Sequence, residues 1–231
     1  MLIGPQNLPV ALAAVRERIA RAAVSAGRDP ADVTLVAVGK TQPAEVLRAA
    51  AAAGVTDFGE NYLQEAETKI DLLADLPLTW HYIGRVQANK TRAIASRFAW
   101  VHGLDRIEIA RRLSDQRSPH LPPLQVCIQV ALVAEAGKGG LPPAAVPELA
   151  GAVVRLPRLR LRGLMCLPPA LSDPQRQHAV FTEMRALRER MNAEGFAMDV
   201  LSMGMSGDFE AAIAAGATHV RIGTALFGER H

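Results

Sequence analysis

The residue with the clearest capacity for chemistry is Lys40, which follows a run of apolar and β-branched residues. The run Val33–Val38 (VTLVAV) lacks strict alternation of polar and apolar residues, which is typical of a strand buried on both faces. Gly39 ends the run, and Pro43 opens a predicted helix. Since parallel α/β folds carry their ligands at the carboxyl ends of the strands, the Lys40 amine is a candidate nucleophile. The alternative is a solvated lysine at a strand end.

Two segments late in the chain combine glycines with hydroxyl side chains. They are SMGMSG, which starts at Ser202, and RIGT, which starts at Arg221. Such glycines let backbone N–H groups approach a phosphate closely, and the hydroxyl groups and the starts of the following helices add further donors. The residues in question are Gly204, Ser206, Gly207, Gly223 and Thr224. The alternative is that the glycines only form turns.

Eight strand-like segments, each followed by a helix-like segment, must position these residues. A helical period of apolar residues over Leu8–Ala26 precedes them. The predicted strands are Val33–Val38, Val55–Phe58, Leu78–Ile83, Ala99–Leu104, Leu124–Val133, Leu159–Leu167, Met198–Met203 and His219–Ile222. This alternation predicts an α/β fold, a single (β/α)₈ TIM-type barrel with an extra N-terminal helix. No linker or shift in composition divides the chain, so we expect one domain over residues 1–231.

In such a barrel, the lysine after the first strand is a neighbour of the two glycine-rich loops. A lysine beside a phosphate site suggests pyridoxal 5'-phosphate (PLP), held by its phosphate and by a Schiff base to Lys40. Arg221 would then meet the pyridine nitrogen. Because a guanidinium can only donate hydrogen bonds, it would keep that nitrogen unprotonated and weaken the ring as an electron sink. The alternative for Arg221 is an ion pair that lines the mouth of the barrel.

Six segments between about Leu8 and Glu229 carry a family resemblance: AVGKTQP, FGENYLQE, WHYIGRVQANK, GLMCLP, SMGMSGDFEAAI and VRIGTALFG. They resemble the signature segments of the pyridoxal phosphate homeostasis proteins, single-domain relatives of the alanine racemase barrel. The resemblance implies a PLP-binding barrel with the cofactor bound covalently to Lys40. It also implies phosphate contacts from Ser206, Gly223 and Thr224, and a contact between Arg221 and the ring nitrogen.

Asn61 and His81 match motif positions that line the mouth in this family, so both are candidate PLP-binding residues. Asn61 can also cap the helix that follows it, and His81 can also be a packed strand histidine. The chain departs from its relatives at Gly39 and Gly139, where serine is frequent, and at Ala131, where a polar residue is common. We therefore predict no role for the loop that contains Lys138.

The sequence favours a PLP carrier over an enzyme. A racemase needs two acid/base groups, one on each face of the substrate, and in the racemase relatives a tyrosine of a second domain supplies one of them. Tyr62 and Tyr82, the only tyrosines here, lie in a helix start and inside a strand. We therefore expect no catalytic residues, and a protein that buffers PLP or delivers it to apo-PLP enzymes. The alternatives are a slow racemase-like enzyme, and a barrel that binds another phosphorylated metabolite.

Composition excludes several other classes of function. Aromatic residues make up 4% of the chain, too few for a base-stacking nucleic-acid surface, and no Cys/His cluster suggests a metal site. Cys127 and Cys166 lie in apolar runs and are expected to be small buried hydrophobes. No signal sequence or membrane span is visible, which predicts a cytoplasmic protein. Without the second domain of the racemases, a monomer is expected.

Overall fold

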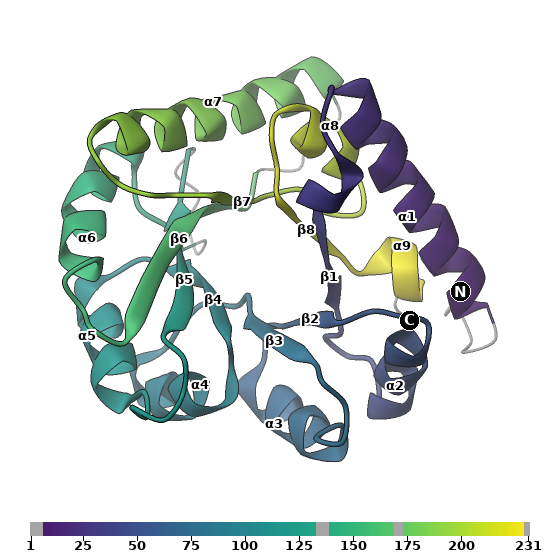
Figure 1. Cartoon of the computed structure of the whole chain (residues 1–231), viewed down its shortest axis with the longest axis horizontal. Helices are drawn as coiled ribbons and strands as arrows, with labels where there is room; N and C mark the ends of the chain where they lie inside the picture. Colours follow the sequence, from purple (N-terminus) through teal and green to yellow (C-terminus); the bar gives the residue numbers. More distant parts are fainter. Residues whose placement is uncertain (1–6, 133–138, 169–172, 229–231) are drawn as a thin grey trace.

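The computed structural model describes residues 7–132, 139–168 and 173–228. In this part of the chain, parallel strands form a closed barrel in the order β1 to β8, with helices around the outside (Figure 1). The strands are β1 Thr34–Val38, β2 Asp57–Glu60, β3 Thr79–Tyr82, β4 Trp100–Leu104, β5 Leu124–Val130, β6 Leu159–Cys166, β7 Val200–Ser202 and β8 His219–Ile222. The predicted (β/α)₈ barrel is confirmed.

The barrel closes where β1 pairs with β8. Thr34 lies beside His219 and Ala37 beside Ile222, and on its other side β1 pairs with β2. Every pair of neighbouring strands is parallel. The carboxyl ends of the strands therefore meet at one mouth, which brings Lys40 after β1 next to Thr224 after β8.

Helices cover the outer face of the barrel. They are α1 Leu8–Ser25, α2 Ala44–Ala52, α3 Leu63–Leu72, α4 Thr91–Arg97, α5 Ile107–Gln116, α6 Val146–Val153, α7 Pro174–Ala193, α8 Phe209–Ala214 and α9 Thr224–Phe227, with short 3₁₀ turns η1 Pro30–Asp32, η2 Ala88–Lys90 and η3 Pro143–Ala145. The extra N-terminal helix α1 lies along α8 and α9 (Figure 1). It buries Leu12, Val15 and Ile19, which recur at helical spacing.

The two faces of the strands differ in character. Outward residues such as Phe58, Val101 and Leu164 pack with the helices in the main hydrophobic core. The smaller second apolar cluster, which the alternation of the strands places inside the barrel, contains Trp100, Cys127, Met165 and Val200. This interior also holds polar side chains that are buried: His81, His102, Ser202, His219 and Arg221. Such residues are unusual in a barrel interior, which is ordinarily filled by branched apolar side chains.

Both cysteines are buried, as expected. Burial raises the pKa of the Cys127 and Cys166 thiols to about 12, so neither is a thiolate nucleophile at neutral pH. Cys127 packs inside the barrel, and Cys166 lies in the main core at the end of β6.

One local prediction was wrong. Asn61 does not cap α3, because Tyr62 occupies the N-cap position and no side chain caps that helix. Helices do follow β7 and β8, and they span six and four residues. Their contribution to a phosphate site stays a prediction. No helix in the described part of the chain combines the length and apolar character needed to cross a membrane. The single-domain assignment for residues 1–231 stays a prediction, since the described segments begin at residue 7 and end at residue 228.

Candidate functional site

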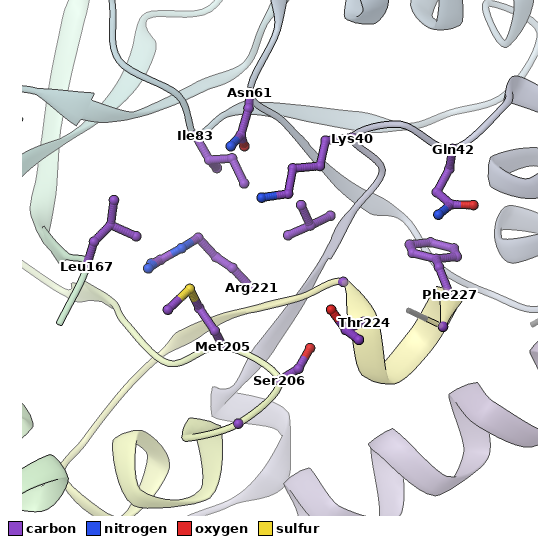
Figure 2. Close-up of a pocket in the computed structure, with 14 residues that line it drawn as sticks. Lys40, Gln42, Asn61, Ile83, Leu167, Met205, Ser206, Arg221, Thr224 and Phe227 are labelled. Carbon is purple, nitrogen blue, oxygen red and sulfur yellow. The ribbon is translucent and has the colours of Figure 1, made fainter. Parts of the chain in front are cut away.

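A cavity of about 260 Å³ opens at the carboxyl ends of the strands. Its lining includes Lys40, Asn61, Arg221 and the loops that follow β7 and β8. Figure 2 shows the Lys40 and Asn61 side chains directed into this space, with Ser206 and Thr224 facing it from the two loops. The structure therefore brings together most of the residues that the sequence singled out from distant parts of the chain.

The turn that carries Lys40 is tightly constrained. The N–H of Gln42 donates to the carbonyl of Gly39 at 2.9 Å, and the N–H of Thr41 donates to Glu65 Oε2 at 3.0 Å. Thr41 has φ +65°, in the left-handed region that β-branched residues rarely adopt. A strained conformation persists only where its surroundings impose it, which indicates that the direction of Lys40 is set by this turn.

A buried ion pair between Lys69 and Glu60 contacts the backbone of the same turn. Lys69 Nζ donates to Glu60 Oε1 at 2.8 Å and to the carbonyl of Gly39 at 2.7 Å. Burial raises the pKa of Glu60 to about 7, because the cost of desolvating the carboxylate outweighs the attraction of Lys69. A Cβ at position 39 would lie 2.6 Å from Glu60 Oε1, so glycine leaves room for this pair. The sequence did not reveal it, since nothing in the local pattern links Lys69 to Gly39.

The two glycine-rich loops join at the cavity. Ser206 Oγ accepts a hydrogen bond from the N–H of Ala225 at 3.2 Å, which links the loop after β7 to the one after β8. A Cβ at Gly207 would meet nothing within 4 Å, and one at Gly223 would make only ordinary contact with Val38. The protein's own packing therefore does not require glycine at these two positions, whereas close approach of a ligand to the backbone would.

Gly204 has a different role from the one predicted for it. It adopts φ +94°, and a Cβ there would lie 2.7 Å from the Cβ of Ala212 and 3.0 Å from the Cα of Phe209. Its backbone carbonyl accepts from the N–H of Arg221 at 2.9 Å. Gly204 is thus needed to pack the loop against α8, and it is not among the residues that line the cavity.

Arg221 is held at the edge of the cavity by neutral acceptors. Its Nη1 donates to Ser202 Oγ at 2.6 Å and its Nη2 to the carbonyl of Cys166 at 2.8 Å, and the residue is 3% exposed. Burial lowers the pKa of its guanidinium, and Asp208 attracts it through space. No salt bridge pairs Arg221 with a carboxylate in the described residues, so the ion pair considered as an alternative is not observed there. Among the described lining residues, Lys40 and Arg221 are the ones that carry charge.

Asn61 presents an unpartnered amide oxygen at the cavity. The residue lines the cavity, and its Oδ1 is buried with no hydrogen-bond partner among the residues that the structure describes. Since the oxygen and nitrogen of an amide can exchange places by a flip, this side chain can donate to or accept from a bound group.

The prediction that His81 lines the mouth was wrong. Its side chain is fully buried inside the barrel, bonded to Asp57 and His102, and the alternative of a packed strand histidine holds. The residue from this segment that does reach the cavity is Ile83, two positions further along.

Residues 133–138, with Lys138, lie outside the described residues. No group of three or more His, Cys, Asp or Glu side chains within the described ranges could hold a metal ion.

No functional role was predicted for the residues that form the remaining walls of the cavity. They are Val38, Gln42, Leu167, Met205, Phe227 and Gly228, with Ile83. Most are apolar, as in ligand sites generally, where a few polar groups fix orientation within an apolar wall. Apolar residues beside strand ends carry no sequence signal that separates a cavity wall from the core.

Comparison with known proteins identifies the family. Residues 10–231 match the family model described as alanine racemase, N-terminal domain. The chain is 58% identical over 219 residues to the pyridoxal phosphate homeostasis protein of Pseudomonas aeruginosa, covering 95% of this chain and 94% of that protein. It is 49% identical over 222 residues to the protein of the same name from Escherichia coli, with 95% of each covered.

A solved structure of a related protein supports the same family assignment. The structure of PipY from Synechococcus elongatus with PLP bound superposes with a TM-score of 0.85 at 35% sequence identity, and covers 96% of this chain and 100% of that one. The chain belongs to the family of the alanine racemase N-terminal domain and, within it, to the pyridoxal phosphate homeostasis proteins.

Proposed function

We propose that this protein binds PLP in the cavity at the barrel mouth, with a Schiff base to Lys40, and takes part in PLP homeostasis by buffering or delivering the cofactor. The observation that carries the proposal is the meeting of the Lys40 amine with the Ser206 and Thr224 loops in one cavity. The PLP bound to PipY and the naming of the relatives as pyridoxal phosphate homeostasis proteins support it. Apo-PLP enzymes would be the acceptors.

Each cavity residue has a distinct part in this proposal. Lys40 forms the covalent bond to the aldehyde, and the backbone at Gly223, together with the hydroxyls of Ser206 and Thr224, holds the phosphate. Arg221 faces the pyridine nitrogen and keeps it unprotonated, because a guanidinium can only donate hydrogen bonds and cannot accept one from a protonated nitrogen. When bound, the cofactor would supply an electron sink, and Arg221 weakens that sink. Asn61 offers its unpartnered amide to the bound group.

The composition of the cavity favours a carrier over a racemase. Reversible transfer of a proton on both faces of a substrate needs a second acid/base group besides Lys40. Neither tyrosine lies among the lining residues: Tyr62 is 59% exposed, and Tyr82 is buried against Phe98. Arg221 stays protonated at physiological pH and cannot act as a base. The described cavity therefore holds and releases PLP more readily than it turns over an amino acid.

Titration with PLP tests the binding site. We expect an absorption band near the visible edge in the wild type, and its loss in Lys40→Ala. Pyridoxal, which has the aldehyde but no phosphate, should bind far more weakly, and the combined variant Ser206→Ala/Thr224→Ala should reduce this preference for the phosphorylated form. Equal binding of PLP and pyridoxal by the wild type would contradict the assignment of the two loops. Saturable binding of PLP without the band would favour a phosphate-ligand site with no Schiff base.

The alternative of a slow PLP enzyme is favoured by one observation, the Lys40 amine in a chain of the alanine racemase N-terminal family. Exchange of the Cα proton of L- and D-amino acids in heavy water separates the two functions. The carrier predicts no exchange beyond that caused by free PLP. Exchange by the wild type that vanishes in Lys40→Ala would overturn the carrier assignment and establish an enzyme.

A further inference from the structure

Five polar side chains form a continuous line of hydrogen bonds through the interior of the barrel. Arg221 Nη1 lies 2.6 Å from Ser202 Oγ, which lies 2.7 Å from His102 Nδ1. His102 Nε2 lies 2.9 Å from His81 Nδ1, and His81 Nε2 lies 2.9 Å from Asp57 Oδ1. These five residues are the interior array. They come from β2, β3, β4, β7 and β8.

The interior array spans the barrel from one end to the other. Arg221 lines the cavity at the mouth, whereas Asp57 is the first residue of β2 and lies at the opposite end. There Asp57 borders a second hollow, together with Thr34 and Thr56. The side chain of Asp57 is 22% exposed and that of His81 is 0% exposed. A partly solvated carboxylate is thus linked to a buried guanidinium.

For neutral imidazoles, the two ends of the array give every hydrogen bond in it one direction. A guanidinium can only donate, so Ser202 Oγ accepts from Arg221 and its own hydroxyl is free to donate to His102 Nδ1. A carboxylate can only accept, so His81 donates through Nε2, and a neutral His81 accepts at Nδ1 from His102. Each imidazole then carries its proton on Nε2. Hydrogen bonds that point the same way polarise one another and strengthen the line.

The surroundings of the imidazoles agree with this state. Desolvation lowers the pKa of His81, although Asp57 opposes the shift, and it lowers the pKa of His102 well below its usual range. Positive charge on His81, His219 or Arg221 would lower the pKa of His102 further. Trp100 stacks on His81 with its ring centroid 5.4 Å away. The imidazoles therefore stay neutral at physiological pH.

A polar line of this kind needs an explanation other than stability. Buried polar and ionic groups are often replaceable by apolar residues of similar volume without loss of stability. A barrel interior is normally filled by branched apolar side chains, and apolar packing is found here around Cys127 and Met165. The interior array instead ends on the one arginine that lines the cavity among the described residues.

We propose that Ser202, His102, His81 and Asp57 are positioning residues for Arg221. Together they hold its guanidinium at the edge of the cavity, and the carboxylate of Asp57 stabilises its charge through the aligned hydrogen bonds. The consequence for the bound ring rests on the proposed function, in which Arg221 faces the pyridine nitrogen. The hydrogen-bond directions do not rest on it, since they follow from the protein alone.

The first test therefore uses the ligand-free protein. Nitrogen chemical shifts of the imidazoles, measured by NMR near neutral pH, should show His81 and His102 as neutral Nε2–H tautomers. The Ser202→Ala variant should broaden or shift the Arg221 side-chain N–H signals, and Ser202→Thr, which keeps the hydroxyl, should restore them. An Nδ1–H tautomer or an imidazolium at either histidine would overturn the proposal.

The second test measures PLP binding. Ser202→Ala should weaken it roughly tenfold, the loss expected for a hydrogen bond to a charged group, and Ser202→Thr should recover most of it. Asp57→Asn should weaken it about threefold, because the amide oxygen still accepts from His81 but carries no net charge. Asp199→Asn is the matched control, since Asp199 also lies at the start of a strand but pairs with Arg162 outside the array.

The two tests separate the two proposals. If the wild type fails to bind PLP, the proposed function is wrong, and the tautomers still decide on the interior array. If the wild type binds PLP and the Ser202→Ala and Asp57→Asn variants both match Asp199→Asn in affinity and in the Arg221 signals, the positioning role is wrong.

Discussion

Two lysine side chains lie at the turn after β1, that of Lys40 from the turn itself and that of Lys69 from α3. Their surroundings give them different roles. Lys40 lines the cavity, whereas Lys69 is buried against Glu60 and the carbonyl of Gly39. Lys69 cannot reach a ligand without breaking two hydrogen bonds. It supports the backbone that precedes Lys40. Burying this lysine requires a buried partner, Glu60, and desolvating the Glu60 carboxylate costs free energy.

This arrangement predicts a pH effect on stability from Glu60. Its pKa is raised from 4.5 to about 7, so the folded state keeps a proton that the unfolded state has already lost. The stabilisation is present below about pH 4.5 and is lost as the pH rises to about 7, a change of about 3 kcal/mol. In urea unfolding, Glu60→Gln should therefore gain stability relative to wild type as the pH rises from about 4.5 to about 7. The exposed Glu45→Gln is the control, and a constant difference for Glu60→Gln would contradict the raised pKa.

At the scale of elements, the pairing of β6 with β7 depends on one glycine. Gly163 pairs with Val200, and a Cβ at Gly163 would lie 1.8 Å from the carbonyl oxygen of Val200. A backbone atom cannot move aside as the end of a side chain can. Because Ser202 lies on the same short strand, β7, any displacement here would also disturb the acceptor of Arg221.

The substitution Gly163→Ala should accordingly destabilise the protein by about 2 kcal/mol or more, since the strands must separate to admit the methyl group. Gly151→Ala is the matched control: Gly151 lies within α6, and a Cβ there meets nothing within 4 Å. That change should be neutral or stabilising by up to about 1 kcal/mol through helix propensity. Urea unfolding of both variants checks the contrast, and equal effects would show that the β6–β7 pairing is looser than described.

For the whole molecule, the polar barrel interior predicts sensitivity to acid. Burial lowers the pKa values of His81 and His102, and that of His219 to about 3. The unfolded chain takes up these protons near pH 6.5, so the stability that the neutral imidazoles contribute is lost as the pH falls below about 6.5. Glu60 acts in the opposite direction over part of this range, and three imidazoles outweigh one carboxyl group.

The expected result is a net uptake of protons on unfolding near pH 5.5, with an upper limit of about two protons, or roughly 2.7 kcal/mol lost per pH unit. Urea unfolding at several pH values, followed by tryptophan fluorescence, gives this slope directly. His219→Gln, a buried substitution outside the interior array, should reduce the slope by about one proton if it folds. A free energy of unfolding that is flat between about pH 7 and about pH 5 would show that the folded state binds as many protons as the unfolded state over this range, and would contradict the lowered pKa values of the imidazoles.

The sequence was sufficient to predict the features that depend on residues close together in the chain. Gly39, Gly84 and Gly223 end strands, and this punctuation located the barrel mouth and the residues that follow each strand, including Lys40 and Thr224. It was insufficient where partners lie far apart: His102 and Ser202 are 100 positions apart, and Lys69 reaches back 30 positions to Gly39. His81 was misplaced because its distance from the strand end decides whether it faces the mouth or the interior, and ends are uncertain by a residue or two.

The central claim is that Lys40 carries PLP, and borohydride reduction followed by peptide mass mapping tests it most directly. The chain has four lysines, Lys40, Lys69, Lys90 and Lys138, so the adduct can be assigned without ambiguity. We predict a phosphopyridoxyl group on Lys40 at one per chain, absent from Lys40→Arg, which keeps the positive charge but cannot form the Schiff base. No adduct at Lys40 after incubation with PLP, or one that is equally abundant at the other lysines, would contradict the proposed function.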